Sequence, residues 1–185
     1  DIQPHSYGEP LLDGRLPSFC SYIREKIPLA SISIYTNGEL LNIGWYKKLV
    51  SAGVNKFRVT QHLDNESKGT LDVIRYREKQ DFDNIEFTYT RLNNINSRGG
   101  LVDVDEGKLR QECNYPDHHV GISFDGQILI CCNDYLNEAK VGNIKDEKLI
   151  EIWQKPIYKD IRTNIRSGNF TLDICKNCTD GKVYT

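Results

Sequence analysis

A repeat of strand-like and helix-like segments in the first ninety residues is the feature that most limits what this chain can fold into. Segments 31–35, 56–61 and 85–91 are rich in β-branched and aromatic residues. With a fourth strand end expected near Tyr7, they recur every ~26–30 residues, enough for one strand and one crossover helix. This period predicts a parallel sheet or barrel, whose ligands lie at the carboxyl ends of the strands.

Helical patterns fill the intervals between these segments. Apolar residues recur at helical spacing over 19–26 and 43–50, and a weaker pattern covers 70–80. We expect the first helix to end before Pro28 and the second to be capped by Gly53. The first part of the chain is therefore predicted to be α/β.

Charge and hydropathy exclude several classes of protein. The 185 residues contain 24 Lys and Arg against 26 Asp and Glu, a net charge of −2, which fits neither a basic nucleic-acid binder nor an acidic tail. No apolar run approaches the ~20 residues of a membrane helix, and no signal peptide is visible. We expect a cytoplasmic protein without nucleic-acid or membrane partners.

The last third of the chain has a different, cysteine-containing pattern. Segments 119–124 and 127–131 flank Asp125-Gly126, a two-residue hairpin signal. Helical patterns follow over 149–153 and 156–166, the second beginning at a proline suited to the first turn. We expect this part to be a small α+β module.

Four cysteines form a candidate ligand set: Cys113, Cys131, Cys175 and Cys178. Two of them share one Cys-x-x-Cys turn, whereas zinc ribbons usually offer two such turns. An iron–sulfur cluster accepts the more scattered arrangement, so the spacing favours a cluster over zinc. A disulfide pair is a third interpretation and fits a chain without a secretion signal poorly.

The two remaining cysteines are weaker candidates. Cys132 follows Cys131 directly, and neighbouring side chains of a strand point to opposite faces, so only one of the two easily joins the other three. Cys20 lies on an apolar helical face and is expected to be a buried core thiol.

Polar residues follow each expected strand end, and turn geometry alone explains any single one of these loops. Four such loops on one rim favour a ligand site. His62 lies on this rim, and we assign it no catalytic role. The four loops are Gly8-Glu9-Pro10, Thr36-Asn37-Gly38, Thr60-Gln61-His62 and Asn96-Ser97-Arg98-Gly99-Gly100.

Several motifs together resemble those of radical S-adenosylmethionine (radical SAM) enzymes that carry a SPASM/twitch auxiliary-cluster module. They are YGEPLL at 7–12, YTNG at 35–38, VTQH at 59–62, RGG at 98–100 and the spacing of the four candidate cysteines. The resemblance implies an incomplete parallel (β/α) radical SAM barrel over 1–105 and a small cysteine-rich twitch/SPASM module over 106–185.

The chain departs from this family in one respect. The family's Cys-x₃-Cys-x₂-Cys, which holds the catalytic [4Fe–4S] cluster, is absent from the sequence. In the family this motif lies upstream of the Gly-Glu-Pro segment, so we expect the chain to lack its N-terminal end and to be inactive alone.

The resemblance also implies cofactors and roles. It selects Cys131 over Cys132 as ligand of an auxiliary [4Fe–4S] cluster, and it implies S-adenosylmethionine and a second [4Fe–4S] cluster. The carboxylate of Glu9 would accept hydrogen bonds from the cofactor's ammonium group, and Gly8 would allow close backbone approach. Thr36, Asn37 and Gln61 would contact its ribose or carboxylate. A flavodoxin or ferredoxin would supply electrons.

Three functions stay open. The first is oxidation of an alcohol to a ketone on a cyclitol or aminosugar, started by a 5′-deoxyadenosyl radical, with the auxiliary cluster accepting an electron. The second is a SPASM-type maturase acting on a peptide, and the third is a non-enzymatic iron–sulfur or zinc module. Arg98 is the candidate catalytic residue that orients substrate; the alternative is a loop arginine paired with Asp103 or Asp105.

Overall fold

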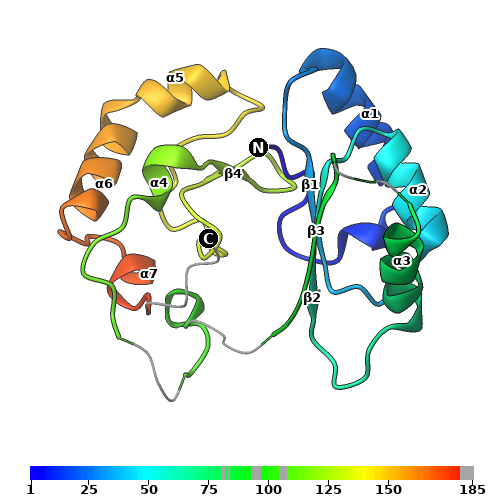
Figure 1. The fold of residues 1–185 in the computed structure, drawn as a ribbon. Coiled ribbons are helices and arrows are strands. Elements are labelled where there is room, and N and C mark those ends of the chain that lie inside the picture. The colour runs from blue at the N-terminus through cyan, green and yellow to red at the C-terminus, as the bar shows by residue number, and fades with distance from the viewer. Residues whose placement is uncertain (81, 83, 93–96, 105–107, 180–185) are drawn as a thin grey trace. The chain divides into compact units, whose positions relative to one another are not determined.

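The structure is a computed structural model that describes residues 1–80, 82, 84–92, 97–104 and 108–179. The chain forms two compact units, Asp1–Asn93 and Asn94–Thr185 (Figure 1). The domain boundary that the sequence places between residues 105 and 106 lies outside the described residues.

The first unit is built on a parallel sheet. Strands β1 (Ser33–Thr36), β2 (Lys56–Gln61) and β3 (Glu86–Arg91) pair side by side in the order β1-β2-β3. The prediction of parallel strands is confirmed, while a complete barrel is not shown by this structure. The carboxyl ends of the three strands share one edge, which is where parallel sheets bind ligands.

The strand expected to end near Tyr7 is a wrong prediction. Only Ile2 makes a parallel bridge, to Ile32, and residues 3–7 form no strand. His5 instead uses its side chain, because its Nε2 atom accepts a 3.0 Å hydrogen bond from the backbone N–H of Tyr35. This hydrogen bond to the His5 side chain therefore takes the place of the backbone hydrogen bonds that a strand would make there.

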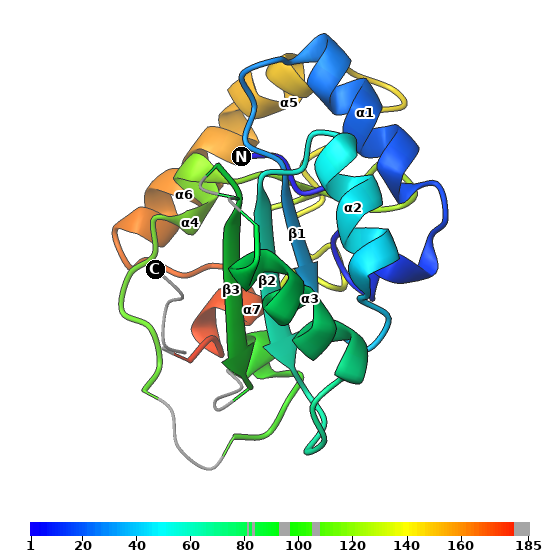
Figure 2. The same cartoon turned by 45° about the vertical axis from the view of Figure 1, so that its right-hand side comes forward.

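The helices of the first unit lie on the same side of its sheet in Figures 1 and 2. Asn42 caps one of them by accepting a 3.0 Å hydrogen bond from Trp45 N, and Ser67 caps another by accepting from Thr70 N. Their apolar faces form one core with the sheet, in which Cys20 is fully buried and burial raises its thiol pKa to about 11. The helices are α1 (Leu16–Lys26), α2 (Ile43–Ser51) and α3 (Lys68–Glu78), preceded by the short 3-10 helix η1 (Pro10–Leu12).

The second unit combines a small hairpin with helices. Strands β4 (Gly121–Ile122) and β5 (Ile128–Leu129) pair antiparallel. The helices of the described residues are η2 (Arg98–Gly100), α4 (Tyr115–His118), α5 (Leu149–Gln154), α6 (Pro156–Arg166) and α7 (Asp173–Lys176). Buried residues of β5, α5 and α6 form a separate apolar core, including Ile128, Ile152 and Tyr158.

The hairpin turn differs from the predicted two-residue turn. Gly126 N donates to Ser123 O at 3.0 Å, so the central residues of the turn are Phe124 and Asp125. Gly126 follows them at φ 88°, the left-handed position of a three-residue loop. The glycine therefore closes the turn instead of occupying its centre.

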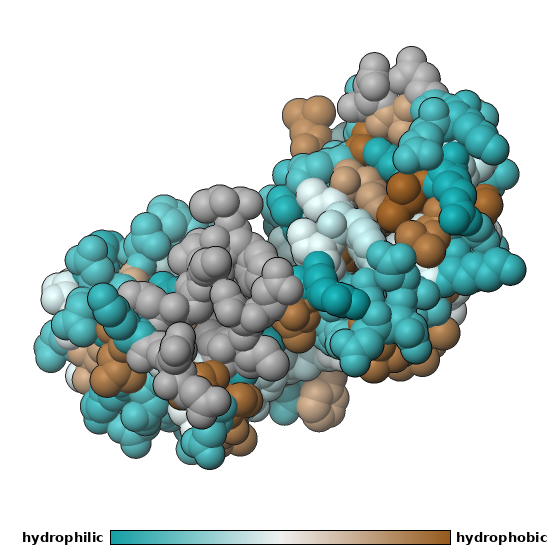
Figure 3. All heavy atoms as spheres, turned by 60° about the horizontal axis from the view of Figure 1, so that its bottom comes forward, coloured by the Kyte–Doolittle hydropathy of each residue, from teal (hydrophilic) through white to brown (hydrophobic). Residues whose placement is uncertain are grey.

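The surface is mixed in character. Hydrophilic side chains cover most of the face shown in Figure 3, with hydrophobic residues in small groups between them. Among the described residues, every helix is too short or too polar to cross a membrane.

Candidate cofactor and cluster sites

Glu9 connects the loop before η1 to the carboxyl end of β1. Its Oε1 atom accepts hydrogen bonds from Leu11 N at 3.0 Å and from Thr36 Oγ1 at 2.7 Å, and its Oε2 atom accepts one from Asn37 N at 2.8 Å. A carboxylate has about four acceptor positions, so these donors leave about one for a ligand. The structure thus gives Glu9 a positioning role that the sequence did not indicate.

The turn after β1 requires glycine at position 38. Gly38 has φ 81°, and a Cβ atom there would lie 2.7 Å from Val59 Cγ1 and 2.8 Å from Thr70 Oγ1. Thr70 also donates from its hydroxyl to Gly38 O at 2.7 Å, so the turn packs closely on β2 and α3. This fixes the backbone around Asn37, a predicted contact of the cofactor.

Gly8, in contrast to the closely packed Gly38, has open space where a side chain would lie. Its φ of 113° lies outside the range that other residues adopt easily, yet no atom lies within 4 Å of the position of a Cβ atom. The backbone at Gly8 therefore borders open space, while the neighbouring Pro10 is buried at the start of η1. Close approach of a ligand to Gly8 stays a prediction.

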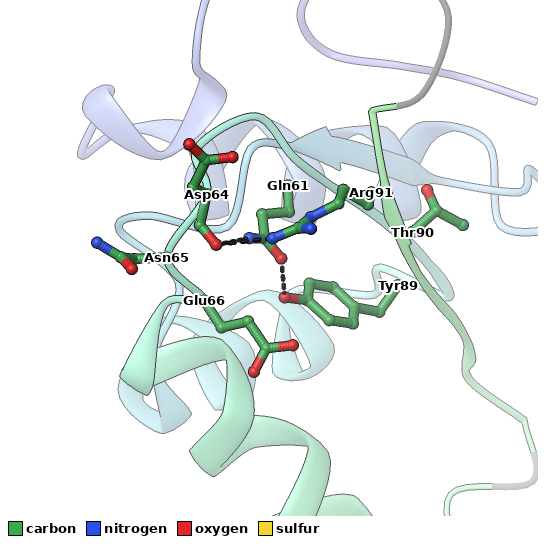
Figure 4. A pocket seen from close by; sticks show the side chains of 7 residues that line it. All are labelled: Gln61, Asp64, Asn65, Glu66, Tyr89, Thr90 and Arg91. Carbon is green, nitrogen blue, oxygen red and sulfur yellow. Dashed lines mark hydrogen bonds between the residues drawn. The ribbon is translucent and has the colours of Figure 1, made fainter.

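Gln61 lies at the carboxyl end of β2 and is buried. Its Nε2 atom donates to the backbone oxygens of Leu63, at 2.5 Å, and Asp64, at 3.2 Å, and its Oε1 atom accepts a 2.5 Å hydrogen bond from the Tyr89 hydroxyl (Figure 4). Its amide thus holds the following loop in place. Whether it also contacts a cofactor stays a prediction.

A pocket of about 560 Å³ opens at this edge of the sheet. Arg91 closes one side of it by donating from Nη2 to Asp64 O at 2.7 Å. Sequence reasoning missed Tyr89, although its position two residues before the end of the segment 85–91 placed it near the rim. The exposed His62 is not among the lining residues, which are Gln61, Asp64, Asn65, Glu66, Tyr89, Thr90 and Arg91 (Figure 4).

The four candidate cysteine ligands interact with one another in the second unit. Burial is the main cause that raises the pKa of the Cys175 thiol, and Cys178 and Cys113 raise it further; burial raises the pKa of Cys131 in the same way, with smaller effects from Cys132 and Cys175. All four are partly buried, whereas Cys132 is exposed. The fold therefore brings together thiols from three separate parts of the sequence.

Burial controls the protonation of these thiols. Desolvation raises the pKa of Cys175 to about 12, and it also raises the pKa of Cys131 and of Cys178 above the usual value. Such thiols stay protonated near pH 7 unless a positive partner stabilises the thiolate. Iron is such a partner, and its binding releases the protons.

Hydrogen-bond donors face three of the four sulfur atoms. Asn133 N donates to Cys131 Sγ at 3.4 Å, and Asn133 Nδ2 donates to Cys178 Sγ at 3.6 Å. Cys113 Sγ accepts from Tyr115 N at 3.5 Å and from Arg110 Nη1 at 3.9 Å. Hydrogen bonds to ligating sulfurs tune iron–sulfur clusters, so the donor set and its surroundings fit such a group.

The thiols are not arranged as a ready metal site. Within the described ranges, no three or more His, Cys, Asp or Glu side chains form a group that could hold a metal ion as it stands. The fit to a cluster therefore rests on the four soft donors, their mutual interaction and the N–H groups that face them.

Arg98 lies in a tight turn that packs against α7. Arg98, Gly99 and Gly100 have φ values of 49°, 69° and 93°. A Cβ atom on Gly99 would lie 3.1 Å from Ile174 Cβ, and Ser97 Oγ donates to Asn177 O at 2.6 Å. These contacts place the Arg98 backbone beside the Cys175-x-x-Cys178 turn. Asn96, the first residue of the polar loop after the predicted strand 85–91, lies outside the described residues.

Comparison with known proteins identifies the family. Residues 113–179 match the SPASM family model, an iron–sulfur cluster-binding domain. The S-adenosyl-L-methionine-dependent 2-deoxy-scyllo-inosamine dehydrogenase of Niallia circulans is 31% identical over 189 residues, which cover 100% of this chain and 74% of that protein. This chain belongs to the SPASM-containing radical SAM enzymes. It is an oxidoreductase of that family, whose cofactors are S-adenosylmethionine and [4Fe–4S] clusters.

Two solved structures of BtrN are similar to this chain. BtrN in complex with AdoMet and 2-DOIA has a TM-score of 0.83 and 29% identity over 100% of this chain and 74% of that chain. BtrN in an open conformation has a TM-score of 0.73 and 26% identity over 97% of this chain and 73% of that chain. The α/β architecture with a parallel sheet is thereby confirmed for this radical SAM chain.

Proposed function

We propose that this radical SAM chain serves a dehydrogenase that oxidises a secondary alcohol of an aminocyclitol or aminosugar to a ketone. The observation that carries the proposal is the similarity over the entire chain to a 2-deoxy-scyllo-inosamine dehydrogenase, supported by the match to BtrN in complex with AdoMet and 2-DOIA. A polar small molecule, rather than a peptide, is accordingly the proposed substrate.

The oxidation removes two electrons and two protons from a carbinol. When bound, S-adenosylmethionine and the clusters would supply two things: a radical that takes one hydrogen atom from the substrate, and an acceptor for the second electron. The hydroxyl proton would pass to solvent or to a base. The protein itself binds, orients and shields the reacting molecules.

The strand edge of the first unit is the proposed site for S-adenosylmethionine. Glu9 is fixed by three donors, so its remaining acceptor position has a defined direction for the ammonium group of the cofactor. Thr36 and Asn37 adjoin this carboxylate, and Gln61 lies at the end of the next strand. With Gly8 and Pro10 they form the proposed cofactor-binding set.

The second unit carries the proposed acceptor of the second electron. Cys113, Cys131, Cys175 and Cys178 are its proposed ligands, because their thiols interact with one another in a partly buried region. Arg98 is proposed to donate a hydrogen bond to a substrate oxygen, since its turn packs against the helix that carries Cys175. This arrangement would hold the substrate near the electron acceptor.

The test is an assay of the full-length protein, reconstituted with iron and sulfide without oxygen. With S-adenosylmethionine and a reduced flavodoxin, an aminocyclitol deuterated at the oxidised carbon should give a ketone and deuterium in 5′-deoxyadenosine. Modification of a peptide without oxidation of any aminocyclitol would instead identify a maturase. Tightly bound zinc with no iron would contradict a redox function.

A further inference from the structure

Asn133 is the residue that connects two of the proposed cluster ligands. Its backbone N–H donates to Cys131 Sγ at 3.4 Å, and its side-chain Nδ2 donates to Cys178 Sγ at 3.6 Å. The side chain is buried, with 6% of the residue exposed. One residue thus directs two N–H groups to sulfur atoms from distant parts of the sequence.

The segment around Asn133 is held firmly in this position. Asp134 N donates to Cys131 O at 3.2 Å, and the buried Asp134 carboxylate accepts a 2.7 Å hydrogen bond from Glu138 N. The carboxylate of Glu138 in turn accepts from Asp173 N at 2.6 Å and from Ile174 N at 3.0 Å, at the start of α7. The turn with Cys131 and the helix with Cys175 are therefore joined independently of any metal.

We propose that Asn133 is a positioning residue of the auxiliary cluster, which directs Cys131 and Cys178 to one centre and raises the reduction potential of the cluster they bind. The proposal deepens the proposed function and rests on its ligand set. Its physical basis is that an N–H donor stabilises negative charge on sulfur, and the reduced cluster carries one more negative charge than the oxidised one.

The charges around the cysteines explain why such donors matter. The carboxylate of Asp134, directly after Asn133, is buried and accepts hydrogen bonds from Ile130 N and Glu138 N, so it opposes additional negative charge at the proposed ligands. Donors from Asn133 act in the opposite direction, together with the cation of Arg110, whose Nη1 atom lies 3.9 Å from Cys113 Sγ. A group that accepts an electron in a partly buried site needs such donors and cations, because they offset the added negative charge.

The experiment compares Asn133→Leu with the control Asn177→Leu. Leucine keeps most of the volume and the backbone N–H but removes the Nδ2 donor to Cys178. Asn177 also neighbours Cys178, yet it is exposed and its Nδ2 atom donates to Asp173 O. Both variants of this chain are reconstituted without oxygen, and the potential of the cluster is measured by a redox titration followed by electron paramagnetic resonance.

Loss of one hydrogen bond should lower the ratio of reduced to oxidised cluster in Asn133→Leu at a fixed potential by about 2- to 13-fold. For one electron this is a shift of about 20–65 mV to lower potential. Asn177→Leu should leave the potential unchanged. An unchanged potential in an iron-replete Asn133→Leu protein would overturn the inference but leave the ligand set intact.

A second measurement covers the case in which Asn133→Leu does not retain its cluster. In the otherwise unchanged chain, asparagine labelled with ¹⁵N at the side-chain amide should give a weak nitrogen coupling to the reduced cluster in pulsed electron paramagnetic resonance. The coupling should persist in Asn177→Leu. Its absence would overturn the inference, and a wild-type chain that binds no four-iron cluster would overturn the proposed ligand set as well.

Discussion

The carboxylate of Glu9 accepts a 2.7 Å hydrogen bond from the hydroxyl of Thr36, a residue 27 positions later in the sequence. With the bonds from Leu11 N and Asn37 N, this contact joins the Gly-Glu-Pro loop to the end of the first strand. The loop is therefore in place before any ligand binds.

Replacing Glu9 by glutamine should destabilise the first unit. The amide group presents a donor where the carboxylate accepts, so at least one partly buried N–H, of Leu11 or Asn37, loses its partner, at a cost of about 1–3 kcal/mol. The free energy of unfolding can be followed through Trp45 in a Trp153→Phe background. Glu25→Gln, at an exposed position, is the control, and equal stabilities of the two variants would contradict the role of Glu9.

His5 should make the stability of the first unit depend on pH. Burial lowers its pKa below the usual value of about 6.5, and its neutral Nε2 atom accepts from Tyr35 N. As the pH falls below about 6.5 the unfolded chain takes up the proton first, so stability should decline until the pH falls below the folded-state pKa. His5→Gln keeps an acceptor without titrating. If the free energy of unfolding of His5→Gln fell between pH 7 and 5 as steeply as that of the wild-type protein, His5 would not be the cause of the pH dependence.

The adjacent cysteines 131 and 132 should differ in their effect on iron binding. Cys131 interacts with Cys175 and accepts a hydrogen bond from Asn133 N, while Cys132 is exposed. After anaerobic reconstitution, Cys132→Ser should keep about four irons per chain and Cys131→Ser should lose most of them. Iron content and visible absorption measure the difference. The reverse result would assign the ligand role to Cys132.

Arg98→Ala should impair substrate oxidation and spare the cofactor reaction. A hydrogen bond from a charged donor is worth about 1.5–3 kcal/mol, which corresponds to a loss of about 10- to 150-fold in kcat/KM. Uncoupled cleavage of S-adenosylmethionine should continue in the full-length protein. Arg15→Ala, at an exposed ion pair with Asp13, is the control. An unchanged kcat/KM for substrate oxidation in Arg98→Ala would show that Arg98 does not contact the substrate.

Gly100→Ala should destabilise the second unit. The residue has φ 93°, and a Cβ atom there would lie 2.8 Å from Asn177 Cβ, so the backbone would have to move. The left-handed conformation alone costs about 1–2 kcal/mol for a residue other than glycine. Gly14→Ala, in the first unit, controls for a glycine replaced in open space, because no atom lies within 4 Å of its Cβ position, and it should leave the unfolding of the second unit unchanged. Unfolding followed through Trp153 should separate the two variants, and equal effects would show that the turn tolerates a side chain.

Much of the fold could be predicted from local signals that act through the backbone. The proline at position 156 marks the start of α6, and the left-handed Gly53 follows the end of α2. The hairpin was found but its turn was misplaced, because an Asp-Gly pair fits either the centre of a two-residue turn or the end of a three-residue one.

The site was predicted as a set of residues but not as a network. Spacing identifies Glu9 and Gln61 as polar residues at strand ends, yet it does not reveal that other parts of the protein already use most of their hydrogen bonds. Tyr89 and Asn133 were missed because their importance comes from what they donate to. Only the folded chain brings such donors to their acceptors.

Ser97 and Thr179 exchange two hydrogen bonds, Ser97 N to Thr179 Oγ1 at 2.9 Å and Thr179 N to Ser97 Oγ at 3.1 Å. The first and last described stretches of the second unit therefore meet at one point. Domains whose ends meet tolerate circular permutation and insertion into other scaffolds. The described part of the cysteine-bearing unit should therefore accept a linker that joins Ser97 to Thr179, and a circular permutant made in this way would keep both hydrogen bonds.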